Sequence, residues 1–144
     1  MFKWRWLKKG KKTDNFYELL GKEEGLKQLV SNFYSTMETD SKAKNCLAIH
    51  DLTSESKVQE LSKERLMLFL SGWLGGPNLF VENVGPPRMR MRHAHVKIGE
   101  TERTEWLYCM NKAIKLHKFK LSSKQKKTFL NSVTALSLRI KNSA

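Results

Sequence analysis

The sequence predicts an all-α fold in which four helices surround one irregular segment. Nineteen Leu stand against ten Val plus Ile, and this excess favours helix because unbranched side chains lose less rotamer freedom there. All three prolines, Pro77, Pro86 and Pro87, fall in one short stretch, so the chain on either side of it is free to be helical. Four stretches also carry apolar residues at helical spacing.

The first two predicted helices precede the prolines. We expect Gly21 and Gly25 to break the chain and to separate the first helix from a short turn at residues 16–20. The apolar stripe of the first helix consists of Leu26, Leu29, Val30, Phe33, Tyr34 and Met37. The second helix ends at Gly75-Gly76-Pro77, where neither glycine nor proline favours continuation. Its stripe consists of Val58, Leu61, Leu66, Phe69, Leu70 and Trp73.

The last two predicted helices have start signals of their own. The third follows Gly99 and has Glu100 and Glu102 in its first turn, where acids complement the helix dipole. Its stripe consists of Arg103, Trp106, Leu107, Met110, Ile114 and His117. The fourth opens with Ser122 and has Gln125 three residues later, a capping-box pattern. Its stripe consists of Phe129, Leu130, Val133, Leu136 and Ile140. Residues 75–98 lack periodicity, and so long an irregular segment in a compact domain is usually functional.

Length and charge indicate one domain with a basic front end. The chain has 144 residues and a net charge of +13, and residues 1–12 hold six basic residues and no acid. We therefore divide it into a basic extension, residues 1–13, and one domain, residues 14–144. No transmembrane segment or apolar signal region is present. Two cysteines are too few for a disulfide framework. These features predict a cytoplasmic protein.

The residues alone exclude several classes of catalytic and metal site. No nucleophile elbow, P-loop or zinc-finger spacing is present. The four histidines, His50, His93, His95 and His117, have no third ligand at suitable spacing, so on this evidence we interpret them as surface residues. One histidine stands apart from the other three: His93 follows the alternation Arg88-Met89-Arg90-Met91-Arg92. The flanking positive charges favour the neutral imidazole that a metal requires.

Three blocks of the sequence resemble the group II truncated haemoglobins. They are Phe69–Glu82 (FLSGWLGGPNLFVE), Gly85–His93 (GPPRMRMRH) and Ile98–Met110, and Asn32-Phe33-Tyr34 matches the family's Phe-Tyr pair. The resemblance spans residues 14–140. It implies a two-over-two helical sandwich around one haem b.

The resemblance also implies the site residues. His93 takes the place of the proximal iron ligand, and Arg92 that of the residue that pairs with a haem propionate. The haem contacts it implies are Leu66, Phe69, Ile98 and Met110, with Ser62 at the pocket gate. Tyr34 and Trp106 match the polar distal residues, whose O–H and N–H suit a partly negative ligand. The third distal position is His50 or Leu47, depending on where the alignment is shortened. His95-Val96 stand where Pro-Phe is usual, and we expect His95 to be exposed.

The function implied is reversible binding of O2, NO and CO at a His-ligated iron. The same pocket suits NO-detoxifying or peroxide chemistry with a reductase, and the sequence leaves carriage, such chemistry and sensing open. The alternative is a helical binding module whose basic arm contacts nucleic acid or an anionic membrane surface. We expect no specific nucleic-acid binding, because neither a helix-turn-helix nor an RNP motif is present.

Overall fold

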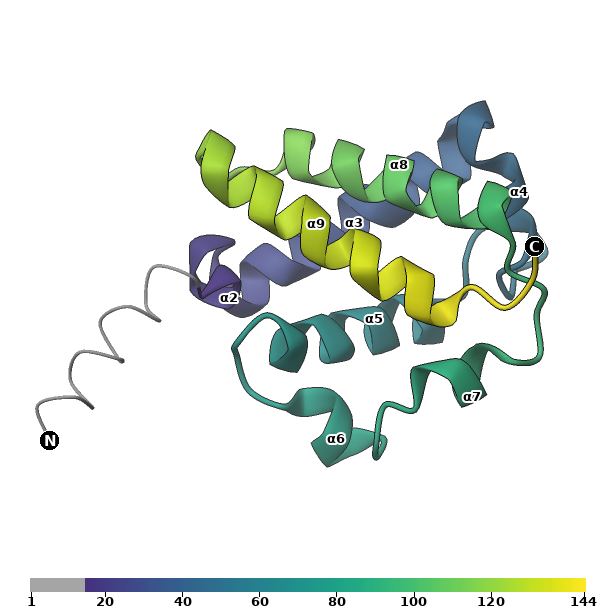
Figure 1. The fold of residues 1–144 in the computed structure, drawn as a ribbon, viewed down its shortest axis with the longest axis horizontal. Helices are drawn as coiled ribbons and strands as arrows, with labels where there is room; N and C mark the ends of the chain where they lie inside the picture. The colour runs from purple at the N-terminus through teal and green to yellow at the C-terminus, as the bar shows by residue number, and fades with distance from the viewer. Residues whose placement is uncertain (1–14) are drawn as a thin grey trace, which may run out of the picture.

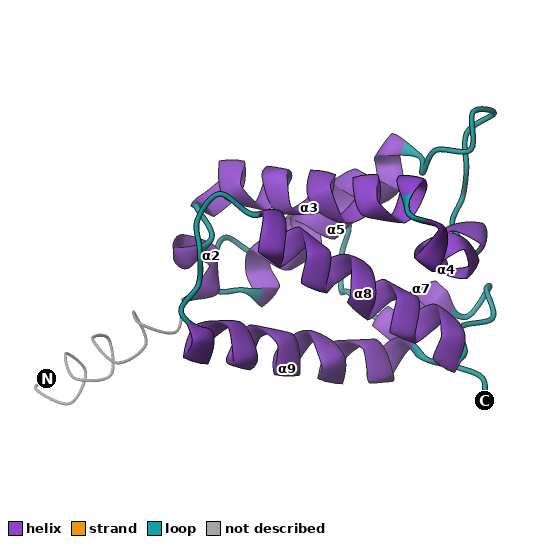
Figure 2. Cartoon of the chain, turned by 90° about the horizontal axis from the view of Figure 1, so that it is seen from above, coloured by secondary structure: helices purple, strands orange, loops and turns teal. Residues whose placement is uncertain are grey.

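The computed structural model describes residues 15–144, and its four long helices form two layers of two (Figure 1). Helices α3 (Lys22–Thr39) and α5 (Glu60–Trp73) form one layer, and α8 (Glu100–Leu116) and α9 (Ser123–Ile140) form the other. Figure 2 shows the two layers from above. The described residues contain no β-strand, only an isolated bridge between Leu52 and Val58. The all-α prediction is confirmed.

The core lies where the predicted apolar stripes meet between the layers. Its fully buried side chains include Phe33 and Met37 from α3, Met110 from α8 and Phe129 from α9. Burying a side chain of this size contributes about 1.5–3 kcal/mol. The stripes therefore fix which face of each helix points inward, and the layers pack accordingly.

Three predicted helix ends are confirmed, two of them by capping contacts. The Ser122 hydroxyl accepts from the Gln125 amide at 3.1 Å, and the Gln125 side chain accepts from the Ser122 amide at 2.9 Å. The Gly99 amide donates to Glu102 at 2.8 Å at the start of α8. Helix α5 ends before Gly75, which has a φ of +104° that favours glycine.

Three details of the helix predictions are wrong. Leu61, predicted on the inward stripe of α5, is 57% exposed. Gly25 does not break the chain but lies inside α3, where a Cβ atom would collide with the carbonyl oxygen of Leu20. The glycine is thus required by the close approach of two segments rather than by a turn. Val58 precedes α5 instead of lying on it. It is buried, and its amide donates to Glu38 at 2.9 Å.

His117 also differs from the expected surface residue. Its side chain is fully buried at the C-terminal end of α8, and its Nε2 lies 2.7 Å from the carbonyl oxygen of Leu20. Since a carbonyl oxygen only accepts, Nε2 carries the proton. Burial of this polar ring is tolerated because the bond joins α8 to the segment before α3.

The predicted irregular segment contains two short helices, α6 (Leu79–Asn83) and α7 (Met89–His93), which lie below α5 in Figure 1. The remaining elements are α2 (Phe16–Leu19), the 3-10 turn η1 (Ser41–Ala43) and α4 (Lys44–Ala48). Across residues 15–144, no helix has the length and apolar character needed to cross a membrane. The basic extension at residues 1–13 lies outside the described residues.

Candidate functional site

A cavity of about 490 Å³ lies between the two layers and α7. This volume is typical of a site for a cofactor or a drug-sized ligand. Helices α3, α4, α5, α7, α8 and α9 all contribute to its walls. Most of its lining is apolar and includes Leu66, Phe69, Phe80, Met89, Val96, Ile98, Leu136 and Ile140. The cavity therefore suits a large apolar group bound at a few polar points.

His93 forms one polar point of the cavity. It is the last residue of α7, and its Nδ1 lies 2.7 Å from the carbonyl oxygen of Met89. Because the carbonyl oxygen can only accept, Nδ1 is the donor, and in the neutral form that a metal requires Nε2 keeps a lone pair. A backbone bond of this kind is the usual support of a metal-binding imidazole.

Asn142, which the sequence reasoning missed, holds the turn that follows His93. Its side-chain amide donates to the carbonyl oxygens of His93 at 3.2 Å and Val96 at 2.8 Å. Its side-chain oxygen accepts from the Ile98 amide at 2.8 Å. The C-terminal tail thus fixes the segment in which His95-Val96 replace the usual Pro-Phe. No local motif marks Asn142, because its partners lie more than forty residues away in the chain.

Arg92 joins the cavity wall to the proline turn before α7. Its Nε donates to the carbonyl oxygen of Pro87 at 2.8 Å, and one Nη to that of Pro86 at 3.1 Å. Its guanidinium carbon lies 5.2 Å from the Phe80 ring centroid. Two further arginines, Arg65 and Arg103, also line the cavity. Arg103 already pairs with Glu100 at 2.8 Å, so Arg92 and Arg65 form the cationic edge that is complementary to carboxylates.

Tyr34 and Trp106 form the opposite polar wall. Tyr34 is only 5% exposed, and its ring packs edge-on against Phe33 at 4.9 Å. Phe33 packs in turn against Trp106 at 5.5 Å, so the rings support one another. Burial raises the pKa of the Tyr34 phenol, which therefore stays protonated. Within residues 15–144, no hydrogen bond engages the Tyr34 hydroxyl or the Trp106 N–H, and both residues line the cavity.

The structure brings His50 to the cavity, whereas Leu47 is not among the lining residues and packs against the core. The His50 ring lies edge-on to Tyr34 at 5.9 Å. Its Nδ1 lies 2.7 Å from the carbonyl oxygen of Cys46, so Nδ1 is the donor. Burial lowers the pKa of His50, which favours the neutral ring. Nε2 of the neutral ring accepts rather than donates.

The other predicted contacts divide between cavity and core. Leu66, Phe69 and Ile98 line the cavity, as does Ser62. Met110 does not: it is fully buried in the core one turn beyond Trp106. His95 is exposed, as expected, at the rim.

Comparison with known proteins decides the family. The model of the family described as "Bacterial-like globin" matches residues 15–142. The chain belongs to this globin family. A relative is the group 2 truncated hemoglobin YjbI of Bacillus subtilis (strain 168), which is 36% identical over 98 residues, or 68% of this chain and 67% of YjbI. Globins bind haem and small gas ligands such as O2, and this globin has that general function.

Solved structures agree with this assignment and establish the two-over-two fold. The cold-adapted truncated hemoglobin of Pseudoalteromonas haloplanktis TAC125 is 34% identical with a TM-score of 0.79, covering 89% of this chain and 98% of its own. The group II 2-on-2 hemoglobin of Agrobacterium tumefaciens is 31% identical with a TM-score of 0.78, covering 90% and 95%. The globin is therefore a group II truncated haemoglobin.

The residues present fit a haem. The cavity combines apolar walls for the macrocycle with arginines for its carboxylates. It also offers two imidazoles, His93 and His50, each with Nδ1 bonded to a carbonyl oxygen so that Nε2 is left for ligation, and His93 is the one in the family's ligand position.

Proposed function

We propose that this globin holds one haem b in the cavity, with His93 Nε2 as the only protein ligand on the proximal side, and binds O2 reversibly. One observation carries the proposal. The supported imidazole of His93 and two donors that have no acceptor among residues 15–144, Tyr34 and Trp106, line the same apolar cavity. In this proposal residues 14–144 form the globin domain, and residues 1–13 are an addition to it.

When bound, the haem supplies a ferrous iron with a position open to O2, NO or CO. The chain supports it from the proximal side. The Met89 carbonyl oxygen orients the His93 ring, and Asn142 fixes the turn beyond it. Arg92 retains donors on Nη1 beyond those bonded to the proline carbonyls, and we assign them to a haem carboxylate. The largely apolar lining would limit the access of water to the bound haem.

On the distal side the chain offers two donors and one acceptor. The Tyr34 O–H and the Trp106 N–H would hold an O2 ligand by donating to it, because such a ligand carries partial negative charge. His50, with its proton on Nδ1, presents an acceptor and acts as a positioning residue beside Tyr34. This division predicts that the two donors, rather than His50, control O2 release.

Haem titration tests the proposal. We expect the purified apo-protein to take up one equivalent of haem with a sharp Soret end point, and the ferrous form to bind and release O2 on cycles of oxygenation. Purging with argon should restore the deoxy spectrum. Failure to form a stoichiometric complex, or oxidation in place of reversible oxygenation, would contradict the proposed function.

A further inference from the structure

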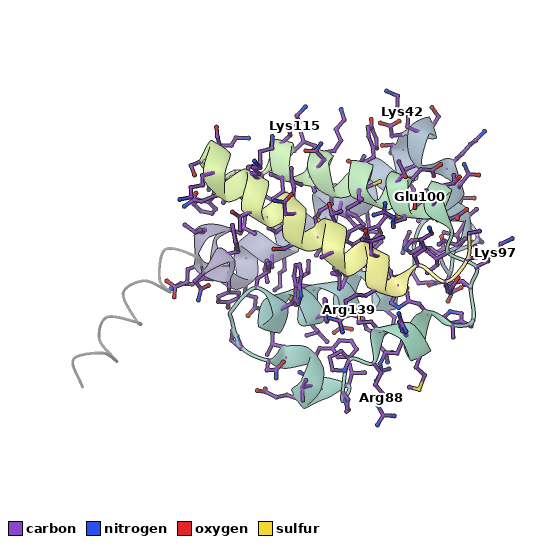
Figure 3. The ribbon with its side chains drawn as sticks, in the orientation of Figure 1. Lys42, Arg88, Lys97, Glu100, Lys115 and Arg139 are labelled. Atoms are coloured by element: carbon purple, nitrogen blue, oxygen red, sulfur yellow. The ribbon has the colours of Figure 1, made fainter. Side chains whose placement is uncertain are left out.

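A second surface lies at the end of the molecule where α8 turns into α9. It exposes two apolar side chains, Leu116 (62% exposed) and Phe119 (47%). Exposed lysines surround them. We call this surface the basic tip and define it by Lys115, Leu116, Lys118, Phe119, Lys120 and Lys124. Lys115 points outward from α8 at the top of Figure 3.

The positive charge of the basic tip is not neutralised nearby. Residues 106–144 contain nine Lys and Arg and no acid. Among the described residues, none of the four lysines of the basic tip forms an ion pair with a carboxylate. The adjacent acids, Glu23 and Glu24, bond Lys27 instead, at 3.2 and 3.7 Å.

The basic tip is held in place by contacts to the start of α3. The Lys118 amide donates to the Gln28 side chain at 3.0 Å. The Phe119 ring lies so close to Gly21 that a Cβ atom there would be 2.5 Å away. Phe119 thus has one edge on the protein and the other in solvent. The exposed apolar groups are part of an ordered turn.

The chain attaches its most basic segment at the same end. Asn15, the first described residue, precedes α2, and both figures of the ribbon place α2 at the end where α8 meets α9. Residues 1–12, which precede this point in the sequence, carry six basic residues together with Trp4 and Trp6. Like charges repel, so this segment and the basic tip are suited to the same anionic partner rather than to each other.

We propose that the basic tip docks this protein on a membrane surface rich in anionic lipid headgroups. Lysines near such a surface are attracted to it, and Leu116 and Phe119 gain free energy by entering the apolar boundary below the headgroups. A nucleic acid would satisfy the lysines but would gain little from an aliphatic side chain such as Leu116. The combination of charge with exposed apolar groups therefore selects a lipid bilayer.

Docking at the basic tip leaves the cavity open. The cavity is lined by the first half of α8 and the last half of α9, whereas the basic tip joins the other ends of these helices. Haem binding and membrane binding are consequently independent, and the proposal does not depend on the proposed function.

Sedimentation with vesicles tests the proposal on the full chain. We expect binding to vesicles of equal phosphatidylglycerol and phosphatidylcholine, no binding to phosphatidylcholine alone, and steep weakening with salt. The triple variant Lys115→Gln, Lys118→Gln, Lys120→Gln should weaken binding about a hundred-fold. The matched triple variant at the other end, Lys42→Gln, Lys44→Gln, Lys97→Gln, should weaken it far less.

A second pair of variants tests the apolar contribution. Leu116→Ser should weaken vesicle binding about fivefold, because it removes apolar surface from the bilayer boundary. Leu138→Ser, which alters a similarly exposed leucine (53%) on α9, should leave binding unchanged. Thermal midpoints measured in parallel show whether each variant is folded.

Three results would overturn the proposal. The first is equal loss of binding in the two triple variants, which would mean that net charge alone is responsible. The second is that Leu116→Ser has no effect and that duplex DNA displaces the protein from the vesicles, which together would indicate a surface that binds any polyanion. The third is complete loss on deletion of residues 1–13 with no effect of the basic-tip variants, which would assign binding to that segment alone.

Discussion

Replacing Tyr34 by Phe removes one oxygen from the distal wall and changes little else. The ring is 5% exposed and rests on Phe33, so the substituted ring has the same packing available. No group among residues 15–144 bonds the hydroxyl, and its removal therefore leaves no protein donor or acceptor unsatisfied. The variant therefore tests only the O–H group that we propose as a hydrogen-bond donor to O2.

The expected effect is large for O2 and small for stability. A hydrogen bond from a buried donor to a partly charged acceptor contributes about 1.5–3 kcal/mol. At about 1.4 kcal/mol for each factor of ten, Tyr34→Phe should speed O2 release about ten- to a hundred-fold. The free energy of unfolding of the apo-protein should not fall, because the lost hydroxyl has no hydrogen-bond partner in the part of the chain that the structure describes.

Stopped-flow dissociation measures this directly. O2 is displaced from the ferrous protein by CO, and CO release is then followed by displacement with NO. CO carries less negative charge on its terminal atom, so we expect its release to change by less than about threefold. Trp106→Phe is the companion variant and should act in the same direction.

O2 release unchanged within a factor of two in both variants would refute the assignment of these donors. An equal acceleration of O2 and CO release would refute it as well, since it would indicate a wider pocket rather than a lost hydrogen bond. Slower O2 release would show that the hydroxyl crowds the ligand.

Three further predictions concern residues around the cavity. Asn142→Asp should speed haem loss to an acceptor apoglobin about tenfold, because it removes two hydrogen bonds behind His93; an unchanged rate would show that Asn142 does not support the ligand. His50→Leu should alter O2 release by less than about threefold, since Nε2 accepts, and a tenfold change would reassign the donor. Arg103 and Lys141 lower the pKa of Glu100 from 4.5 to about 2. Stabilisation by its carboxylate is thus full above pH 4.5 and lost as the pH falls towards 2. Glu100→Gln should therefore lower the thermal midpoint at pH 7 but not at pH 2, and equal midpoints at pH 7 would contradict this.

The sequence predicted the long helices because their signals are local. The capping box at Ser122 and Gln125 and the stop at Gly75 depend only on neighbouring residues, and both appear in the structure as expected. Gly25 was misjudged because its role depends on Leu20 and a close approach of two segments, which no periodicity reveals. The resemblance, rather than the residue pattern, supplied the fold name.

The candidate site shows the same contrast between local signals, which the sequence reveals, and contacts distant in sequence, which it does not. His93, Tyr34 and Trp106 were predicted from motifs that keep their spacing, and all three line the cavity. Asn142 escaped notice because it contacts His93 from the far end of the chain. The proton position of His50 was equally hidden, since it depends on the carbonyl oxygen of Cys46. Contacts distant in sequence and hydrogen-bond directions require coordinates.

The iron–histidine stretch in the resonance Raman spectrum of the ferrous, ligand-free protein tests the central claim most directly. We expect this band in the wild type and in the control His95→Gly, its absence in His93→Gly, and its return in His93→Gly when imidazole is added. A normal band in His93→Gly without imidazole would show that another residue binds the iron and would contradict the assignment of His93.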